Sequence, residues 1–291
     1  MKLASLRDGE TPVWGLIQPW EQVQDAGVQL APPALHQQFP DVRSLLAADG
    51  LQDVVPGLAT APLRPLAGLR FAPVIPNPAR IICVGINYLE HIHEMGRDRP
   101  DYPTLFTRFT DTLVGNAEAI VRPRVSSQYD YEGELAIVIG KTARYVSADN
   151  ALDHVAGYTC FLDGSVRDWQ RHTTQFIPGK NFPATGGCGP WFVTTDEIPD
   201  PGRLTLQTRV NGEVLQHAPV SDLCFGVPRI IEYCSGFCEL QPGDIIATGT
   251  PSGVGFARTP PRWLVPGDTV EVEISGIGIL RNYVVDEAAA A

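Results

Sequence analysis

The chain lacks a long apolar run and an excess of positive charge. No segment approaches the roughly 20 apolar residues of a membrane-spanning helix. The first residues, MKLASLRDGETPVWGLI, contain no apolar core of about 7–15 residues such as a signal peptide has. The net charge of −11 argues against non-specific binding to nucleic acid or to an anionic membrane. We therefore expect a cytoplasmic protein with neither nucleic acid nor membrane as a partner.

Several familiar sequence motifs are also missing. The six cysteines form no Cys-x-x-Cys pair and lie mostly in apolar stretches, so we expect reduced core residues rather than disulfides or a zinc site. No G-x-S-x-G elbow and no G-x-G-x-x-G fingerprint occur, which argues against a serine hydrolase of that type and against dinucleotide binding. The Gly-rich segment ATGTPSGVG, residues 247–255, lacks the spacing of a phosphate-binding P-loop.

Glycine and proline are abundant, with 28 and 26 residues, which favours many turns and short strands. Apolar patterning predicts strands at 13–17, 80–87, 134–140, 154–163, 204–210 and 268–275, and helices at 41–49, 88–96 and 226–237. A proline-rich segment near residue 72 predicts an extended linker. We therefore expect a β-rich mixed α+β fold, with a small N-terminal domain at 1–72 and a larger domain at 73–291.

The segment DYEGELAIVIG places two carboxylates beside a strand that looks buried. Glu132 and Glu134 are two residues apart, so they project from the same face of an extended chain. Asp163 ends another predicted strand, and if it meets them, three oxygen ligands converge. Such ligands select Mg²⁺, Mn²⁺ or Ca²⁺ over zinc. The alternative is an exposed strand end that is salt-bridged to surface Arg or Lys, and spacing alone does not separate the two interpretations.

The segment NYLEHIHEMG predicts a helix with two His–Glu pairs three residues apart. His91 and Glu94 form one pair, and Glu90 and His93 form the other. A carboxylate that orients an imidazole gives a general base. The alternative is a solvated helix face with no catalytic role, and spacing does not choose between the pairs.

A third polar group follows Asp163. Arg167 and Gln170 are three residues apart on a predicted short helix, and Lys180 follows Gly179 in a predicted loop. Arg, Gln and Lys close to a metal suit a substrate that carries carboxylate and carbonyl oxygens. Ordinary surface polarity is the alternative interpretation.

Taken in order, these segments resemble the fumarylacetoacetate hydrolase family over residues 79 to 285. The resemblance rests on CVGINYLEHIHEMG, YEGELAIVIGKTAR, GYTCFLDGSVRDWQ, GKNF…GPW, DIIATGTPSGVG and PGDTVEVEISGIGILRN. It implies the β-roll or sandwich fold of that family's C-terminal domain. It also implies a metal, usually Mg²⁺, sometimes Mn²⁺ or Ca²⁺, on Glu132, Glu134 and Asp163.

The resemblance assigns the remaining site residues as well. It selects His91 and Glu94 as the catalytic dyad and gives Lys180 the stabilisation of negative charge. It gives substrate contacts to Arg167, Gln170 and Thr250. A homodimer is the assembly that it implies.

The implied reaction is hydrolysis of a C–C bond in a β-diketo or acylpyruvate-type acid through a metal-bound enolate. The alternative on the same metal site is an isomerase or tautomerase of a 2-hydroxymuconate-like acid, or a 2-oxo acid decarboxylase. Two positions depart from the family pattern. Pro183 stands where many members have an acidic residue, and Ile86 stands where decarboxylating members often have a basic one.

Overall fold

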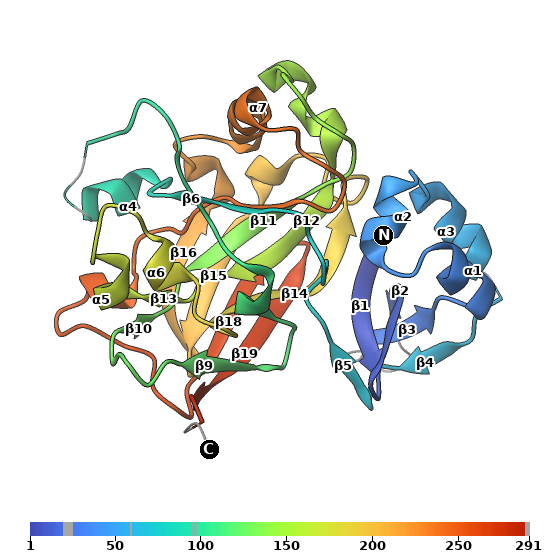
Figure 1. Ribbon diagram of the computed structural model, residues 1–291, viewed down its shortest axis with the longest axis horizontal. Coiled ribbons are helices and arrows are strands. Elements are labelled where there is room, and N and C mark those ends of the chain that lie inside the picture. Colours follow the sequence, from blue (N-terminus) through green and yellow to red (C-terminus); the bar gives the residue numbers. More distant parts are fainter. Residues whose placement is uncertain (20–25, 59, 95, 97, 289–291) are drawn as a thin grey trace.

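The computed structural model describes residues 1–19, 26–58, 60–94, 96 and 98–288. Strands dominate it, as Figure 1 shows. The large sheet contains β1 (Lys2–Asp8), β2 (Thr11–Pro19), β3 (Ala26–Leu30), β4 (Leu63–Pro65), β5 (Leu69–Phe71), β6 (Ile81–Gly85), β7 (Thr104–Thr107), β8 (Leu113–Val114), β11 (Gly133–Ile139), β12 (Val155–Leu162), β14 (Gly186–Thr194) and β17 (Ile245–Ala247). The second sheet contains β9 (Ala119–Arg122), β15 (Thr205–Val210), β16 (Glu213–Pro219), β18 (Thr269–Ile274) and β19 (Gly278–Asp286).

The helices are short. They are α1 (Pro33–Gln38), α2 (Val42–Ala47), α3 (Leu51–Leu58), α4 (Leu89–Glu94), α5 (Arg167–Gln170), α6 (Ile177–Lys180) and α7 (Val227–Phe237). The predicted β-rich mixed fold is therefore confirmed. Within the described residues, no helix is long and apolar enough to cross a lipid bilayer.

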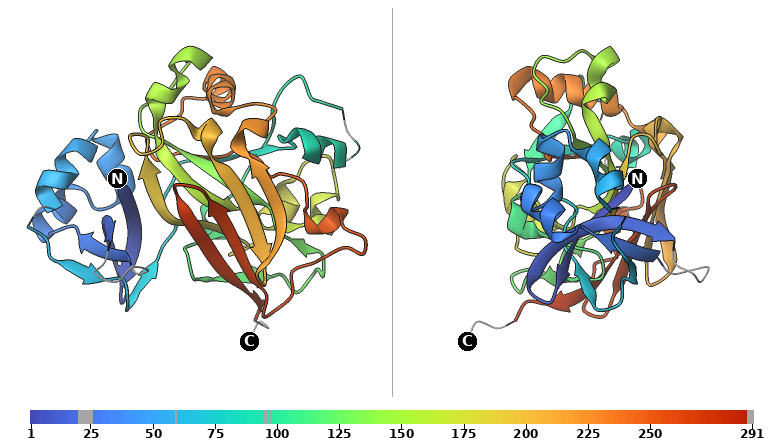
Figure 2. Two further views of the ribbon diagram at one scale, coloured as in Figure 1. Left: turned by 180° about the vertical axis from the view of Figure 1, so that it is seen from behind. Right: turned by 90° about the vertical axis from the view of Figure 1, so that its right-hand side faces the viewer.

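The large sheet is ordered β4-β3-β2-β1-β14-β12-β11-β17-β6-β7, and the second sheet is ordered β16-β15-β18-β19-β9. The second sheet packs on one face of the large sheet, where β12 and β14 contact β19. Figure 2 shows the two layers from behind. Because strands from both layers point apolar side chains inward, one continuous core forms between them.

Strand β11 is buried on both faces, which explains its unbroken apolar sequence. Leu135 and Ile137 point into the core between the two sheets. Ala136 and Val138 point to the opposite face, into a second core that includes residues of the N-terminal region. Since successive side chains of a strand alternate between faces, a strand covered on both sides must be apolar throughout. The site is thereby anchored on a rigid central strand.

The N-terminal region continues the large sheet. Strand β1 pairs antiparallel with β14, with Leu3 opposite Phe192, and helices α1 to α3 pack beside it. Figure 1 shows this region in blue at one end of the molecule. An extended segment joins β5 to β6, as the prolines near residue 72 predict. The division into 1–72 and 73–291 stays a prediction, because the sheet itself crosses that boundary.

Local sequence signals account for several element ends. Asp41 caps α2 by accepting a hydrogen bond of 2.7 Å from the Ser44 N–H. Asn211 and Gly212, with φ of 53° and 81°, form the tight turn between β15 and β16. An aspartate at a helix N-cap and an Asn-Gly pair in a hairpin turn are both common sequence signals for these structures. The described cysteines are free thiols, four of them buried.

Candidate active site

Three carboxylates meet at the start of β11 and the end of β12. Gly133 pairs with Leu162, so the next residues outward, Glu132 and Asp163, lie opposite each other, and the Asp163 N–H donates to the Glu132 carbonyl at 2.8 Å. Glu134 shares the face of Glu132 because it is two residues along the strand. One oxygen from each of the three carboxylates lies within 4.8 Å of the other two, and all three residues are buried.

Buried cationic side chains surround this carboxylate group. The Lys180 ammonium donates to Glu132 at 2.6 Å and to Asp163 at 2.5 Å. The Arg167 guanidinium forms an ion pair with Glu132 at 2.6 Å. Arg108 donates to the other oxygen of Asp163 and to the Gly164 carbonyl. The exposed, surface-paired alternative for these carboxylates is therefore wrong.

The two glutamates have opposite pKa shifts. Burial raises the pKa of Glu134 well above its usual value, and the nearby charges of Asp163 and Glu132 raise it further. Burial acts in the same direction on Glu132, but Arg167 and Lys180 outweigh it and lower its pKa. Burial would lower the pKa of Lys180, but Asp163 and Glu132 raise it. Lys180 therefore remains an ammonium.

The donor set fits a divalent cation. Four buried carboxylates, of Asp130, Glu132, Glu134 and Asp163, lie near three buried cationic side chains, of Arg108, Arg167 and Lys180. With Glu134 ionised, this group carries one excess negative charge. All three converging ligands are hard carboxylate oxygens, which suit Mg²⁺, Mn²⁺ or Ca²⁺.

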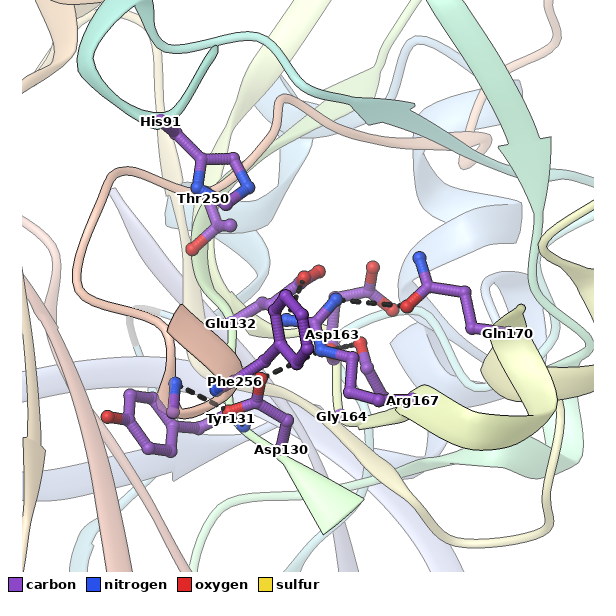
Figure 3. Close-up of polar contacts among 12 residues, drawn as sticks. His91, Asp130, Tyr131, Glu132, Asp163, Gly164, Arg167, Gln170, Thr250 and Phe256 are labelled. Atoms are coloured by element: carbon purple, nitrogen blue, oxygen red, sulfur yellow. Dashed lines mark hydrogen bonds and ion pairs between the residues drawn. The ribbon is translucent and has the colours of Figure 1, made fainter. Parts of the chain in front are cut away.

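Helix α4 resolves the choice between its two His–Glu pairs. His91 is 4% exposed, and its Nδ1 lies 2.7 Å from the Glu94 carboxylate. The other oxygen of Glu94 accepts a hydrogen bond of 2.9 Å from the Gly253 N–H. Glu90 and His93 are exposed. His91 is thus the imidazole that the fold orients, and Figure 3 shows it on the far side of the site from Asp130.

A cavity of about 410 Å³ connects these groups. Its lining residues are Val84, Gly85, Ile86, His91, Thr104, Phe106, Glu132, Glu134, Arg167, Gln170, Arg171, Thr173, Thr174, Phe176, Lys180 and Thr250. A larger groove of about 560 Å³ lies beside β6 and β7, but no carboxylate lines it among the described residues. The smaller cavity is therefore the candidate active site, and every predicted site residue except Glu94 and Asp163 lines it.

The structure corrects one local expectation, for Lys180, and adds detail at Thr250 and Ile86. Lys180 ends the one-turn helix α6 rather than lying in a loop, because Gly179 packs so tightly on α5 that a Cβ would lie 2.4 Å from the Gln170 backbone nitrogen. The Thr250 hydroxyl donates to the Gly133 carbonyl at 2.9 Å and accepts from Gln216 at 2.8 Å. Ile86 lines the cavity with a φ of 57°, a conformation that β-branched residues rarely adopt.

Sequence reasoning missed two buried charges of the site. Arg108 lies between two phenylalanines, and its guanidinium also contacts Thr112 and Thr185. A single cation in the otherwise uncharged segment 102–110 is the available signal. Asp130 continues the alternation of Glu132 and Glu134 by one step, so the same spacing argument could have found it.

Comparison with known proteins identifies the family. Residues 80–285 match the family described as fumarylacetoacetate (FAA) hydrolase C-terminal. The chain belongs to the fumarylacetoacetate hydrolase family. The resemblance seen in the sequence is thereby confirmed, and the β-rich fold agrees with the solved structures of the family.

Individual relatives carry different activities. The chain is 45% identical over 214 residues to oxaloacetate tautomerase YisK of Bacillus subtilis strain 168, covering 72% of this chain and 71% of that protein. It is similar to 5-carboxymethyl-2-hydroxymuconate delta-isomerase from Mycobacterium smegmatis, with 30% identity, a TM-score of 0.78, and coverage of 99% and 100%. It is equally similar to maleylpyruvate hydrolase from Sphingobium sp. SYK-6 in complex with manganese(II) and pyruvate, with 30% identity, a TM-score of 0.79, and coverage of 99% and 100%.

Proposed function

We propose that this protein is a metal-dependent tautomerase or isomerase of a small 2-oxo acid, of the oxaloacetate or hydroxymuconate type. The observation that carries the proposal is the orientation of His91 by Glu94 in the same cavity as the carboxylate group and Lys180. Similarity to oxaloacetate tautomerases supports it. The hydrolase interpretation, our main expectation from the sequence, has less support from the named relatives than this alternative.

The cation would be Mg²⁺ or Mn²⁺, with Ca²⁺ as a further candidate, held by Glu132, Glu134 and Asp163. Such an ion supplies Lewis-acid polarisation of substrate oxo and carboxylate oxygens. Manganese in the maleylpyruvate hydrolase structure supports the choice of a divalent ion. The setting of Glu134 supports it independently, because burial and the neighbouring charges of Asp163 and Glu132 disfavour its carboxylate form, and a bound divalent cation would favour that form.

The protein's own residues then move one proton. In ketonisation, the enol oxygen releases its proton to water, and the neighbouring carbon receives one from His91, which recovers a proton from water, so substrate and protein keep their composition. His91 exchanges the proton at carbon, and Glu94 keeps the imidazole in position. Lys180 stabilises negative charge on the substrate oxygen, because it is a buried cation that lines the cavity. Arg167 and Gln170 bind the substrate carboxylate.

Hydrolytic C–C cleavage is the second candidate. The likeness to maleylpyruvate hydrolase favours it. In that reaction His91 would take a proton from water, and the hydroxide would attack the distal carbonyl. Lys180 would stabilise the resulting oxyanion. The adjacent C–C bond would then break, and the departing carbon would take the proton from His91. Both reactions use the same residues, so product analysis separates them.

A substrate panel tests the proposal. Oxaloacetate, hydroxymuconates and acylpyruvates would each be incubated with protein and Mg²⁺, with enol absorbance and product mass followed together. We expect faster loss of the enol signal without a change of mass. Addition of the mass of water would instead establish hydrolysis, and loss of CO₂ would establish decarboxylation.

A matched pair of histidine variants tests the assignment of the dyad. We expect His91→Ala to lower kcat by about 10²–10⁴, because it removes a general base. His93→Ala should keep wild-type kcat, because that side chain is exposed on the same helix. The reverse pattern would show that the wrong pair was chosen. The expected homodimer stays a prediction, and light scattering of the purified protein checks it.

A further inference from the structure

Asp130 accepts four hydrogen bonds although it belongs to neither the dyad nor the carboxylate group. Its side chain is fully buried. Oδ1 accepts from the N–H groups of Gly255 and Tyr131, both at 2.8 Å. Oδ2 accepts from Arg167 Nε at 2.8 Å and from the Phe256 N–H at 3.0 Å. Each oxygen therefore serves two donors that come from different parts of the chain.

The first of these partners is an arginine that lines the cavity. Besides its bond to Asp130, Arg167 pairs with Glu132 at 2.6 Å and donates to Gln170 Oε1 at 3.0 Å. Figure 3 shows Asp130 and Gln170 on different sides of this guanidinium. The three nitrogens of the planar guanidinium thus each have an oxygen partner at its edge, and Asp130 holds the Nε edge.

The second partner is the turn at Gly255–Ala257. Asp130 fixes the backbone of Phe256, and the centre of the Phe256 ring lies 3.6 Å from the central carbon of the Arg171 guanidinium. Arg171 also lines the cavity. A Cβ on Gly255 would lie 2.6 Å from Asp130 Oδ1, so the close approach of the turn requires glycine there. Two cavity arginines therefore depend on one carboxylate, one directly and one through an aromatic ring.

We propose that Asp130 is a positioning residue, which orients Arg167 directly and Arg171 through Phe256, so that both guanidinium groups bind an anionic substrate. The inference rests on the proposed function only in taking an oxo acid as the ligand. Asp130 acts through the arginines and does not contact the substrate. It determines how strongly the site holds a compact dianion.

The substitution Asp130→Asn is a sharp probe of this role. An amide has one acceptor oxygen, so either orientation of the new side chain would turn its NH₂ group toward two of the four donors. Asp244 offers a matched control, because it too is buried and accepts from an arginine, Arg80, and from backbone N–H groups. It lies at the opposite end of β17 from Thr250, and Arg80 does not line the site cavity.

Oxalate binding in the presence of Mg²⁺, measured by calorimetry below the unfolding temperature of every variant, tests the proposal. We expect Asp130→Asn to weaken oxalate binding at least tenfold, and Asp244→Asn to leave it within about twofold. Equal affinities in these two variants would overturn the proposal, and so would a wild-type protein that fails to bind oxalate. Wild-type oxalate binding without turnover of any oxo acid would remove the proposed function while leaving this inference standing.

A second readout needs no ligand. The Phe256 ring restrains the Arg171 side chain, and trypsin must bind that side chain to cleave after it, so Asp130→Asn should be cut there several times faster than wild type or Asp244→Asn. If Asp130→Asn does not fold, Phe256→Leu replaces it, because that change removes the ring and keeps the bonds of Asp130. Phe256→Leu should also be cut faster and should bind oxalate more weakly. An unchanged cleavage rate and unchanged affinity would contradict the proposal.

Discussion

The two sides of the carboxylate group differ in what offsets their charge. On one side, Glu132 contacts the Lys180 ammonium and the Arg167 guanidinium, and its pKa is lowered. On the other side, Glu134 accepts, within the described part of the chain, one hydrogen bond of 2.8 Å, from the Gly249 N–H, and its pKa is raised. Two glutamates that are two residues apart thus have pKa shifts of opposite direction. Neighbouring side chains from distant segments of the chain determine each direction.

The largest expected effect comes from replacing each glutamate with glutamine in the metal-free protein. Glu132→Gln should lower the free energy of unfolding by about 3–5 kcal/mol, because it leaves buried Lys180 and Arg167 short of an anion. Glu134→Gln should be neutral or stabilising, because glutamine has no charge to bury and, among the described residues, Glu134 has no ion pair to lose. Urea unfolding measures both. Equal destabilisation by the two variants would break the comparison.

Lys180→Met tests the Glu132 side of the carboxylate group, because it removes one of the two cations that contact Glu132. We expect kcat to fall by about 10²–10³, as for the loss of one oxyanion-stabilising group. We also expect Mg²⁺ or Mn²⁺ to bind roughly tenfold more tightly, because a positive charge in contact with two ligand carboxylates is removed. Calorimetric titration with the metal measures this. Weaker metal binding would show that Lys180 supports the ligands instead of competing with the ion.

Gly249→Ala tests the Glu134 side of the carboxylate group, because the Gly249 N–H donates to Glu134. Gly249 has a φ of 103°, and an added Cβ would lie 2.8 Å from Asn87 Cβ and 2.9 Å from the Val84 carbonyl oxygen. The turn must move, which carries the N–H away from Glu134. We expect a loss of about 1–3 kcal/mol in the free energy of unfolding.

Gly267→Ala is the matched control for that substitution. Gly267 has a φ of 92° and no atom within 4 Å of the added Cβ, so it reports the backbone penalty alone. A Gly249→Ala variant no less stable than Gly267→Ala would show that the contact with Glu134 contributes little.

The smallest expected effect is a pH dependence with opposite signs on the two sides. Stability from the raised pKa of Glu134 is present below the unfolded value of about 4.5 and is lost as the pH rises through the folded pKa. Stability from the lowered pKa of Glu132 is present above that value and is lost as the pH falls. Each slope is at most about 1.4 kcal/mol per pH unit. Urea unfolding of the metal-free protein from pH 4 to 9 should show the Glu134 slope, and Glu134→Gln should remove it.

The sequence predicted the framework of the site because that framework depends on local periodicity. Alternation put Glu132 and Glu134 on one face, and the strand end at Leu162 put Asp163 within reach. The choice of His91 over His93 depends on which face of α4 is buried, and residue spacing alone does not determine that face. The roles of Arg108 and Asp130 depend on contacts with segments far along the chain, and no pattern in a short window contains them.

The opposite pKa shifts could not be predicted at all from the strand. The pKa of Glu132 is lowered by Arg167 and Lys180, which come from α5 and α6, and the pKa of Glu134 is raised by burial and by Asp163, which follows β12. Lys180 was expected in a loop because Gly179 precedes it. In the fold, that glycine allows two helical turns to touch, so its role is close packing and not flexibility.

The pairing of β1 with β14 has a consequence for synthesis on the ribosome. Lys2 lies opposite Val193, so β1 meets this neighbour only after the 190 residues between them have been made. At about 5–20 residues per second, that interval is on the order of ten to forty seconds. During this time β1 can pair with β2 and, from Leu6 to Asp8, with β5, but its edge at Lys2 and Leu3 stays open until β14 is made. Cells that make this protein must therefore keep one nascent strand edge from pairing with a neighbouring chain.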